Sequence, residues 1–198
     1  MPDDAELELA LDFIDAGNLD EGIAMLRDVV AASPDDVRAL FALGAALGHA
    51  GARAEAVDLY ARVCAIIPDA PEALDAWAAA LGEVGRRDDA LAVCDRIADL
   101  PGFEGAAALR RARVELAAGR LPAALAAFEE AYRREPGRPR RRTISFEHGR
   151  ALLRAGRPAD ALALFDRAVG DTSEPEDDEQ AEEMARLRGE CADQLARS

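Results

Sequence analysis

The chain contains no lysine, only two histidines and only three cysteines among its 198 residues. Neither His49 nor His148 lies at a recognised motif spacing from a cysteine or serine, and no H-E-x2-H is present. Cys64, Cys94 and Cys191 lack C-x2-C spacing and fall on apolar helical stripes, so we expect reduced thiols that pack as small apolar side chains. We therefore predict no catalytic residues, no metal site and no cofactor.

Long apolar runs are also missing. The most apolar stretch, residues 39–52, is too short and too interrupted by glycine to span a bilayer. The N-terminal residues 1–4 are acidic, which is unlike a signal peptide. No glycine-rich phosphate loop is present, because the glycines occur singly and at regular intervals. These absences predict a soluble, cytoplasmic protein that does not contact membranes.

The chain lacks the positive charge of a general nucleic-acid-binding protein, since its net charge is −15. The charge is unevenly distributed. Residues 1–104 carry 22 acids and 7 arginines, residues 105–170 carry 7 acids and 14 arginines, and residues 171–198 carry 10 acids and 3 arginines. The segment Arg133–Arg142 has six arginines and two prolines. Because of this local positive charge, nucleic-acid binding through the segment is a less favoured alternative.

Glycines, small residues and large residues recur along the chain with a period of 34 residues. Glycines recur at this spacing, with a last interval of 37, at Gly17, Gly51, Gly85, Gly119 and Gly156. A small residue follows each of them at Gly22, Ala56, Ala90, Ala124 and Ala161, and a larger one stands a turn later at Leu26, Tyr60, Cys94, Phe128 and Phe165. Because separate markers stay in register over five periods, the pattern predicts a helical repeat.

The stretch 37–70 shows the repeat most clearly. Its pattern is L-x2-L-G-x2-L, a glycine turn, A-x3-Y and a proline eight residues later. This resembles the tetratricopeptide (TPR) repeat, whose signature is W-x2-L-G-x2-Y…A-x3-F…P over 34 residues. The resemblance covers roughly residues 3–170. It implies an all-α, right-handed superhelix, or α-solenoid, of helix-turn-helix repeats.

On this interpretation residues 1–198 form a single domain of eleven helices. The repeats span about 3–36, 37–70, 71–104, 105–138 and 142–172, and a capping helix covers about 174–197. A capping-box signal, Ser173-x2-Glu176, precedes that last helix. In the fourth repeat Arg111 and Glu115 stand where apolar residues are expected, which leaves open a rotation or one-residue shift of its first helix. The three-residue insertion within Arg133–Arg142 is interpreted as a lengthened loop between repeats.

The TPR resemblance implies a concave groove, lined by the first helix of each repeat, that binds another protein. Equivalent positions predicted to face it are Leu7, Phe41, Asp75, Leu109 and Phe146. One turn further on are Leu11, Ala45, Ala79, Arg113 and Arg150, and Arg154 follows Arg150 by another turn. The groove would be mostly apolar and positive at its C-terminal end, which suits an acidic peptide with apolar anchors. The alternative is that these arginines form a solvated face.

We predict a non-catalytic adaptor that binds a peptide or partner-protein segment; a small chaperone that sequesters a partner is the alternative. TPR cochaperones that grip the C-terminal carboxylate of heat-shock proteins use a Lys/Asn/Arg clamp. That clamp is missing from the first three repeats, where the corresponding positions are Leu7, Leu11, Ala42, Glu72 and Ala76. No helix precedes the first repeat, so partial exposure of Leu7, Leu9 and Leu11 predicts weak self-association.

Overall fold

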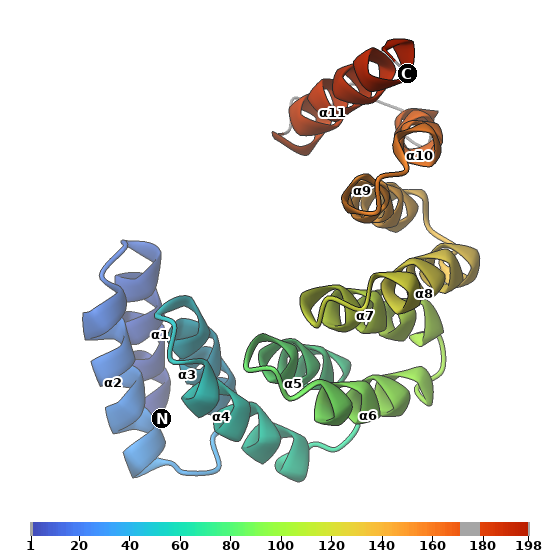
Figure 1. Ribbon diagram of the computed structural model, residues 1–198. Coiled ribbons are helices and arrows are strands. Elements are labelled where there is room, and N and C mark those ends of the chain that lie inside the picture. Colours follow the sequence, from blue (N-terminus) through green and yellow to red (C-terminus); the bar gives the residue numbers. More distant parts are fainter. Residues whose placement is uncertain (1, 171–178, 198) are drawn as a thin grey trace. The chain divides into compact units, whose positions relative to one another are not determined.

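The computed structural model describes residues 2–170 and 179–197, and all regular structure in these ranges is helical (Figure 1). The described helices number eleven, as the repeat pattern predicted. In chain order they are α1 (Pro2–Asp15), α2 (Leu19–Ala32), α3 (Val37–His49), α4 (Arg53–Ile66), α5 (Pro71–Glu83), α6 (Arg87–Ala98), α7 (Glu104–Ala117), α8 (Leu121–Arg134), α9 (Arg138–Arg154), α10 (Pro158–Gly170) and α11 (Glu179–Ala196).

Consecutive helices pack as hairpins, α1 on α2 through α9 on α10, and within each unit the hairpins stack as in an α-solenoid. A glycine with φ between 70° and 88° ends the first helix of each hairpin, at Gly17, Gly51, Gly85, Gly119 and Gly156. The next amide donates to a carbonyl five residues earlier, as Ala52 does to Leu47 at 2.8 Å. Only glycine adopts this left-handed conformation at no steric cost, so the period of the turn glycines follows directly from the hairpin turns.

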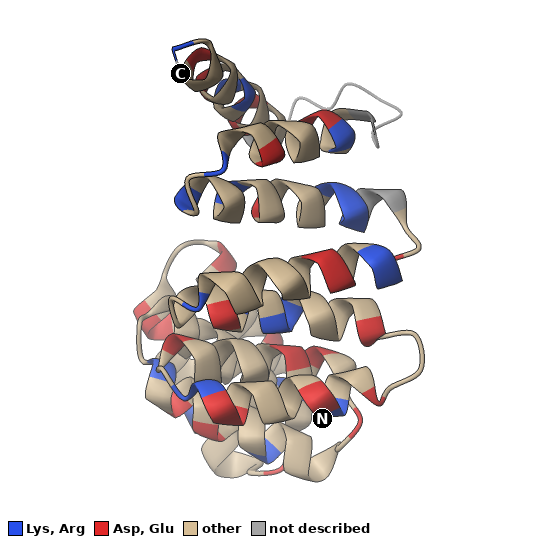
Figure 2. Ribbon diagram, turned by 45° about the vertical axis from the view of Figure 1, so that its right-hand side comes forward, with Lys and Arg blue, Asp and Glu red and all other residues tan. Residues whose placement is uncertain are grey.

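The chain divides into two compact units, residues 1–100 and 101–198. Unit 1 holds α1–α6 and unit 2 holds α7–α11. Acidic residues are spread over the helices of unit 1, whereas arginines occupy both ends of α9 in unit 2 (Figure 2). That residues 1–198 behave as one domain stays a prediction.

Within a hairpin, a small residue on the first helix faces a large residue on the second. A Cβ atom added to Gly44 would lie 3.0 Å from the ring of Tyr60. One added to Gly149, at the equivalent place on α9, would lie 2.4 Å from the ring of Phe165. These close approaches explain why a small residue on the first helix, glycine at positions 44 and 149, recurs in step with the large marker on the second helix.

Helix α7 keeps the register of its neighbours. Its buried residues Ala107, Ala108, Ala112, Val114 and Glu115 lie 34 positions after Ala73, Leu74, Ala78, Ala80 and Leu81, which are buried on α5. The rotation or shift considered for the fourth repeat is therefore wrong. Glu115 simply takes a leucine position, 5% exposed, where its carboxylate lies 3.6 Å from the guanidinium of Arg120.

The insertion near residue 138 lengthens a helix rather than a loop. Helix α9 has 17 residues, whereas α3 and α5 have 13 each, and only residues 135–137 connect α8 to α9. The predicted long loop over Arg133–Arg142 is therefore wrong, because most of that segment belongs to α8 and α9. Helices α3 and α5 begin at Val37 and Pro71, and the equivalent residue of α9 is Arg142. The added turn of α9 therefore precedes Arg142.

Helix α11 covers the last hairpin. Its residues Met184, Leu187 and Cys191 are buried in one cluster with Phe146 and Phe165. The predicted terminal helix is therefore present, while the capping-box signal Ser173-x2-Glu176 lies outside the described residues. The burial expected of the three cysteines is confirmed.

Candidate functional site

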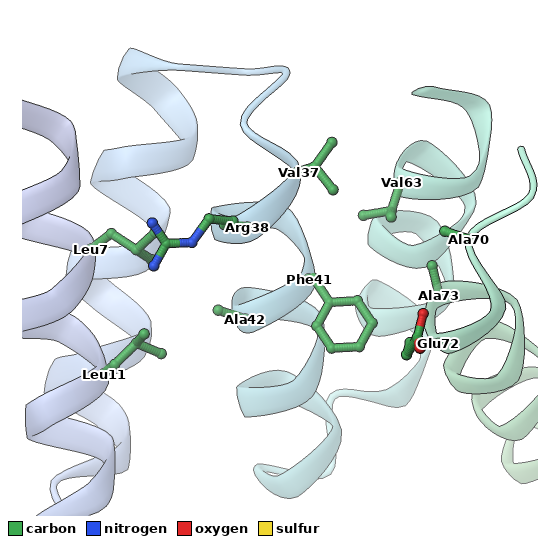
Figure 3. A pocket seen from close by; sticks show the side chains of 10 residues that line it. All are labelled: Leu7, Leu11, Val37, Arg38, Phe41, Ala42, Val63, Ala70, Glu72 and Ala73. Atoms are coloured by element: carbon green, nitrogen blue, oxygen red, sulfur yellow. The ribbon is translucent and has the colours of Figure 1, made fainter. Parts of the chain in front are cut away.

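A pocket of about 370 Å³ lies in unit 1 between α1, α3 and α5, the first helices of three successive hairpins (Figure 3). Helix α4, the second helix of a hairpin, contributes one residue, Val63. The lining residues are Leu7, Leu11, Val37, Arg38, Phe41, Ala42, Val63, Ala70, Glu72 and Ala73. The volume falls within the range of pockets that accept small molecules or large side chains.

The chemistry of this pocket is dominated by aliphatic and aromatic carbon. Its charged residues, Arg38 and Glu72, are exposed. Arg38 donates to the carboxylate of Glu8 at 2.5 Å and lies 3.7 Å from Asp4. The hydrogen bond to Glu8 is the main cause that raises the pKa of Arg38 above its ordinary value. The pocket therefore presents an apolar floor, beside which one guanidinium is already held by acids of α1.

Five of the six sequence-predicted groove residues of unit 1 line one of two hollows, and Asp75 lines neither. Leu7 and Phe41 both line the pocket, although Leu7 is only 1% exposed. The ring of Phe41 packs edge-on against Tyr60 with centroids 5.4 Å apart. Asp75 is half-buried on α5 and is not a lining residue. The residues one turn on, Ala45 and Ala79, line a separate, more polar hollow of about 420 Å³.

Four of the five positions at which a carboxylate clamp would stand also line the pocket: Leu7, Leu11, Ala42 and Glu72. Three of them are apolar and the fourth is an acid. The pocket is thus suited to an apolar group and not to a carboxylate. Leu7 is buried, contrary to the exposure expected for it at the N-terminal end, whereas Leu9 is 47% exposed. Self-association through α1 stays a prediction.

In unit 2, the predicted apolar residues are less accessible. Phe146 is 4% exposed and packs on Phe165 with ring centroids 6.2 Å apart, so its side chain belongs to the core. Leu109 is half-buried and packs against the apolar cluster between α7, α8 and α9. Leu109 and Phe146 lie on first helices, as their spacing from Phe41 predicts. That spacing does not predict the exposed fraction of each side chain.

The predicted arginines of unit 2 are engaged by acids. Arg113 makes a bidentate pair with Glu147 of α9, at 2.8 and 2.5 Å. The guanidinium of Arg150 lies 3.9 Å from Glu183 of α11 and 5.6 Å from the ring centroid of Phe146. Arg154, near the end of α9, is exposed. Two of the three predicted positive charges are thus compensated within the unit.

Sequence reasoning missed Glu147 and Val63 for different reasons. Glu147 lies one helical turn before Arg150, the residue equivalent to Arg113 on the next first helix. An acid one turn before the arginine that is equivalent to Arg113 could have revealed the ion pair between Arg113 and Glu147. Val63 reaches the pocket from α4, a second helix, and only the packing of α4 against α5 brings it there. No spacing rule along the first helices would find it.

His148 lies in the core of unit 2 and not in an open site. His148 is 5% exposed and stacks on Phe128, with ring centroids 5.5 Å apart and planes at 14°. Burial is the main cause that lowers the pKa of His148 below its ordinary value.

None of the described helices combines the length and the hydropathy that a bilayer span requires.

The chain matches the family model described as "Tetratricopeptide repeat" over residues 7–71, 76–139, 109–180 and 146–197. A tetratricopeptide repeat protein from Parabacteroides merdae is 18% identical with a TM-score of 0.76, covering 97% of this chain and 71% of its own. TTC0263, a thermophilic TPR protein in Thermus thermophilus, is 19% identical with a TM-score of 0.68, covering 93% and 98%. PilW, a type IV pilus biogenesis factor, is 18% identical with a TM-score of 0.69, covering 98% and 92%. No curated protein matches the chain.

Proposed function

The chain belongs to the tetratricopeptide repeat family, and from that premise we propose that it is a non-catalytic protein-binding module. Its unit 1 would accept an apolar segment of a partner protein in the pocket between α1, α3 and α5. The observation that carries this proposal is the apolar lining contributed by three successive first helices. A helix or extended segment with one or two large apolar side chains would fill about 370 Å³.

The energetic argument rests on burial. A large apolar side chain that moves from water into such a pocket contributes about 1.5–3 kcal/mol. One or two such anchors give the modest affinity expected of an adaptor, once the cost of ordering the partner is subtracted. Exposed Arg150 and Arg154 in unit 2 supply a second element of the proposal, contact with acidic residues of a partner. Glu183 would compete with such residues for Arg150.

The experiment is a peptide selection against the full chain, followed by affinity measurement on variants. Ala42 is half-buried in the pocket lining, so Ala42→Arg would fill the pocket with a charged side chain. The matched control is Ala92→Arg, at an exposed position of α6. We expect selected peptides to share large apolar residues and to lose at least tenfold in affinity for the Ala42 variant only. Equal binding by wild type and Ala42→Arg would refute the pocket as the site.

Ala42→Glu tests whether the sign of the introduced charge matters. Both substitutions place a charge where an apolar anchor would sit, so both should weaken binding by similar factors. If Ala42→Glu binds normally while Ala42→Arg does not, the pocket recognises a positive group, and the apolar interpretation is wrong. Far-UV circular dichroism of each variant checks that the helices are retained.

A further inference from the structure

A hollow of about 690 Å³ lies in unit 2 between α8, α9 and α10. It is separate from the side chains assigned above to partner binding. Its lining residues are Glu129, Tyr132, Arg133, Arg141, His148, Leu164 and Arg167. Three arginines from three helices thus line the hollow, and two of them, Arg141 and Arg167, lie over the ring of Tyr132.

The hollow arises where the repeat is broken. Arg62 and Arg96 hold equivalent places on α4 and α6, and each donates to the carbonyl of a proline 28 residues earlier, Pro34 and Pro68, at 2.5 and 2.9 Å. Arg167 holds the same place on α10. Because of the insertion, Pro136 lies 31 residues before it, and the guanidinium of Arg167 instead lies 3.9 Å from the ring centroid of Tyr132.

The added turn of α9 supplies the second guanidinium. Arg141 lies within this turn, 5.2 Å from the same tyrosine ring, and its Nε donates to the carbonyl oxygen of Glu135 at 2.6 Å. The ring and carbonyl contacts of Arg167 and Arg141 involve groups without formal charge. They position the two guanidiniums without neutralising them, unlike the carboxylates that hold Arg113 and Arg150.

The charge of the lining suits an anion. Three arginines and one glutamate line the hollow, and because Glu130 compensates Arg133, the remaining charge of Arg141, Arg167 and Glu129 is +1 when His148 is neutral. Burial lowers the pKa of His148, so its imidazole is uncharged near neutral pH. Arg133 is paired with Glu130 of its own helix, which leaves Arg141 and Arg167 as the main cationic groups. A phosphate monoester carries a charge of about −1.5 to −2 near pH 7, and guanidinium groups bind its oxygens in bidentate fashion.

We propose that the hollow between α8, α9 and α10 is a binding site for an organic phosphomonoester. Arg141 and Arg167 would hold the phosphate oxygens. The hollow is much larger than a phosphate group, and Leu164 gives it an apolar wall, so the phosphate is expected to carry an organic substituent. A phosphorylated side chain of a partner and a small phosphate ester share this chemistry.

Calorimetric titration of the full chain with phenyl phosphate, inorganic phosphate and benzoate tests the proposal at about pH 7.5, where the monoester is doubly charged. We expect saturable binding of phenyl phosphate, at least tenfold tighter than that of either other probe. A blocked phosphotyrosine peptide distinguishes the sources: tighter binding than phenyl phosphate indicates a partner side chain, and weaker binding a small ester. A thymidine oligonucleotide without terminal phosphate should not compete.

Arg167→Gln should weaken phenyl phosphate binding at least tenfold. The matched control is Arg62→Gln, which removes one positive charge at the equivalent repeat position and should change affinity less than twofold. Arg167→Lys keeps the charge without the planar fork and should give an intermediate loss, which also serves if Arg167→Gln fails to fold. Absence of saturable binding, equal affinity in Arg167→Gln, or effective competition by the oligonucleotide would overturn the proposal.

Discussion

His148 occupies the place on α9 that Leu43 and Trp77 occupy on α3 and α5, and it is buried against Phe128. A titratable ring at a core position makes stability depend on pH. Burial lowers the pKa of His148 in the folded state, so the unfolded chain binds its proton more readily. The stability contributed by neutral His148 is therefore fully present above the unfolded pKa of about 6.5 and is lost as pH falls below it.

We predict that wild type loses more unfolding free energy than His148→Leu between about pH 7 and pH 5. Leucine is the residue that α3 carries at this place, so the variant removes the titration and keeps an apolar side chain. Urea denaturation at several pH values measures the two slopes. Parallel slopes would show that His148 is not protonated differently in the two states.

Ser145 takes another core position, equivalent to Leu40 and Leu74 on the earlier first helices. Its side chain is fully buried, and its hydroxyl oxygen has no hydrogen-bond partner among the described residues. A buried polar group without a partner costs about 1–3 kcal/mol. We therefore expect Ser145→Ala to raise the unfolding free energy by about 1 kcal/mol, measured by urea denaturation. A loss of stability would instead indicate that the hydroxyl is bonded in solution.

At the scale of helices, the contact between paired helices is set by a small residue facing a large one. Gly149 lies in the middle of α9, and an added Cβ would lie 2.4 Å from the ring of Phe165, which is fully buried and cannot move aside. Gly189 on α11 has nothing within 4 Å of an added Cβ. The two helical glycines therefore offer opposite outcomes for the same substitution.

Gly149→Ala should destabilise the chain by about 1–3 kcal/mol, because overpacking outweighs the gain in helix propensity. Gly189→Ala should stabilise it by about 0.5–1 kcal/mol, because only the propensity changes. Thermal and urea denaturation of the pair, at the same pH, provide the comparison. If Gly149→Ala is also stabilising, α9 and α10 are not packed as closely as described.

The elements could be predicted from the sequence wherever the repeat markers persist. The turn glycines and the small and large pairs have direct steric causes, so hairpin order and helix number followed from them. The extension of α9 could not be predicted, because arginine is tolerated in both loops and helices, and a proline near the start of a helix resembles one in a loop. The candidate site was found only in part. Its first-helix positions follow the repeat, while Val63 and the acids that engage Arg113 and Arg150 depend on tertiary packing.

At the scale of the whole chain, an acidic N-terminal half precedes a basic segment, and this boundary falls near the division between the two units. Trp77, the only tryptophan, lies in unit 1, whereas helices are present in both units. Tryptophan fluorescence therefore reports unit 1, and far-UV circular dichroism reports the entire chain.

We predict that fluorescence and circular dichroism follow one coincident urea transition, because the sequence indicates a single domain of consecutive repeats. Leu43→Ala in unit 1 should shift both signals together, with a loss of about 2–5 kcal/mol. Separate midpoints for fluorescence and circular dichroism would show that the units unfold independently, contrary to a single domain.

The central claim, that the pocket between α1, α3 and α5 receives an apolar partner segment, is tested most directly by a methyl-resolved NMR titration with a selected peptide. The pocket has methyl groups on Leu7, Leu11, Val37 and Val63, and Ala42 lies beside them. We predict that the largest shift changes occur at these methyls and disappear in Ala42→Arg. Shift changes that centre on methyls outside the pocket, such as those of Leu91 or Ala92 on α6, would contradict the account.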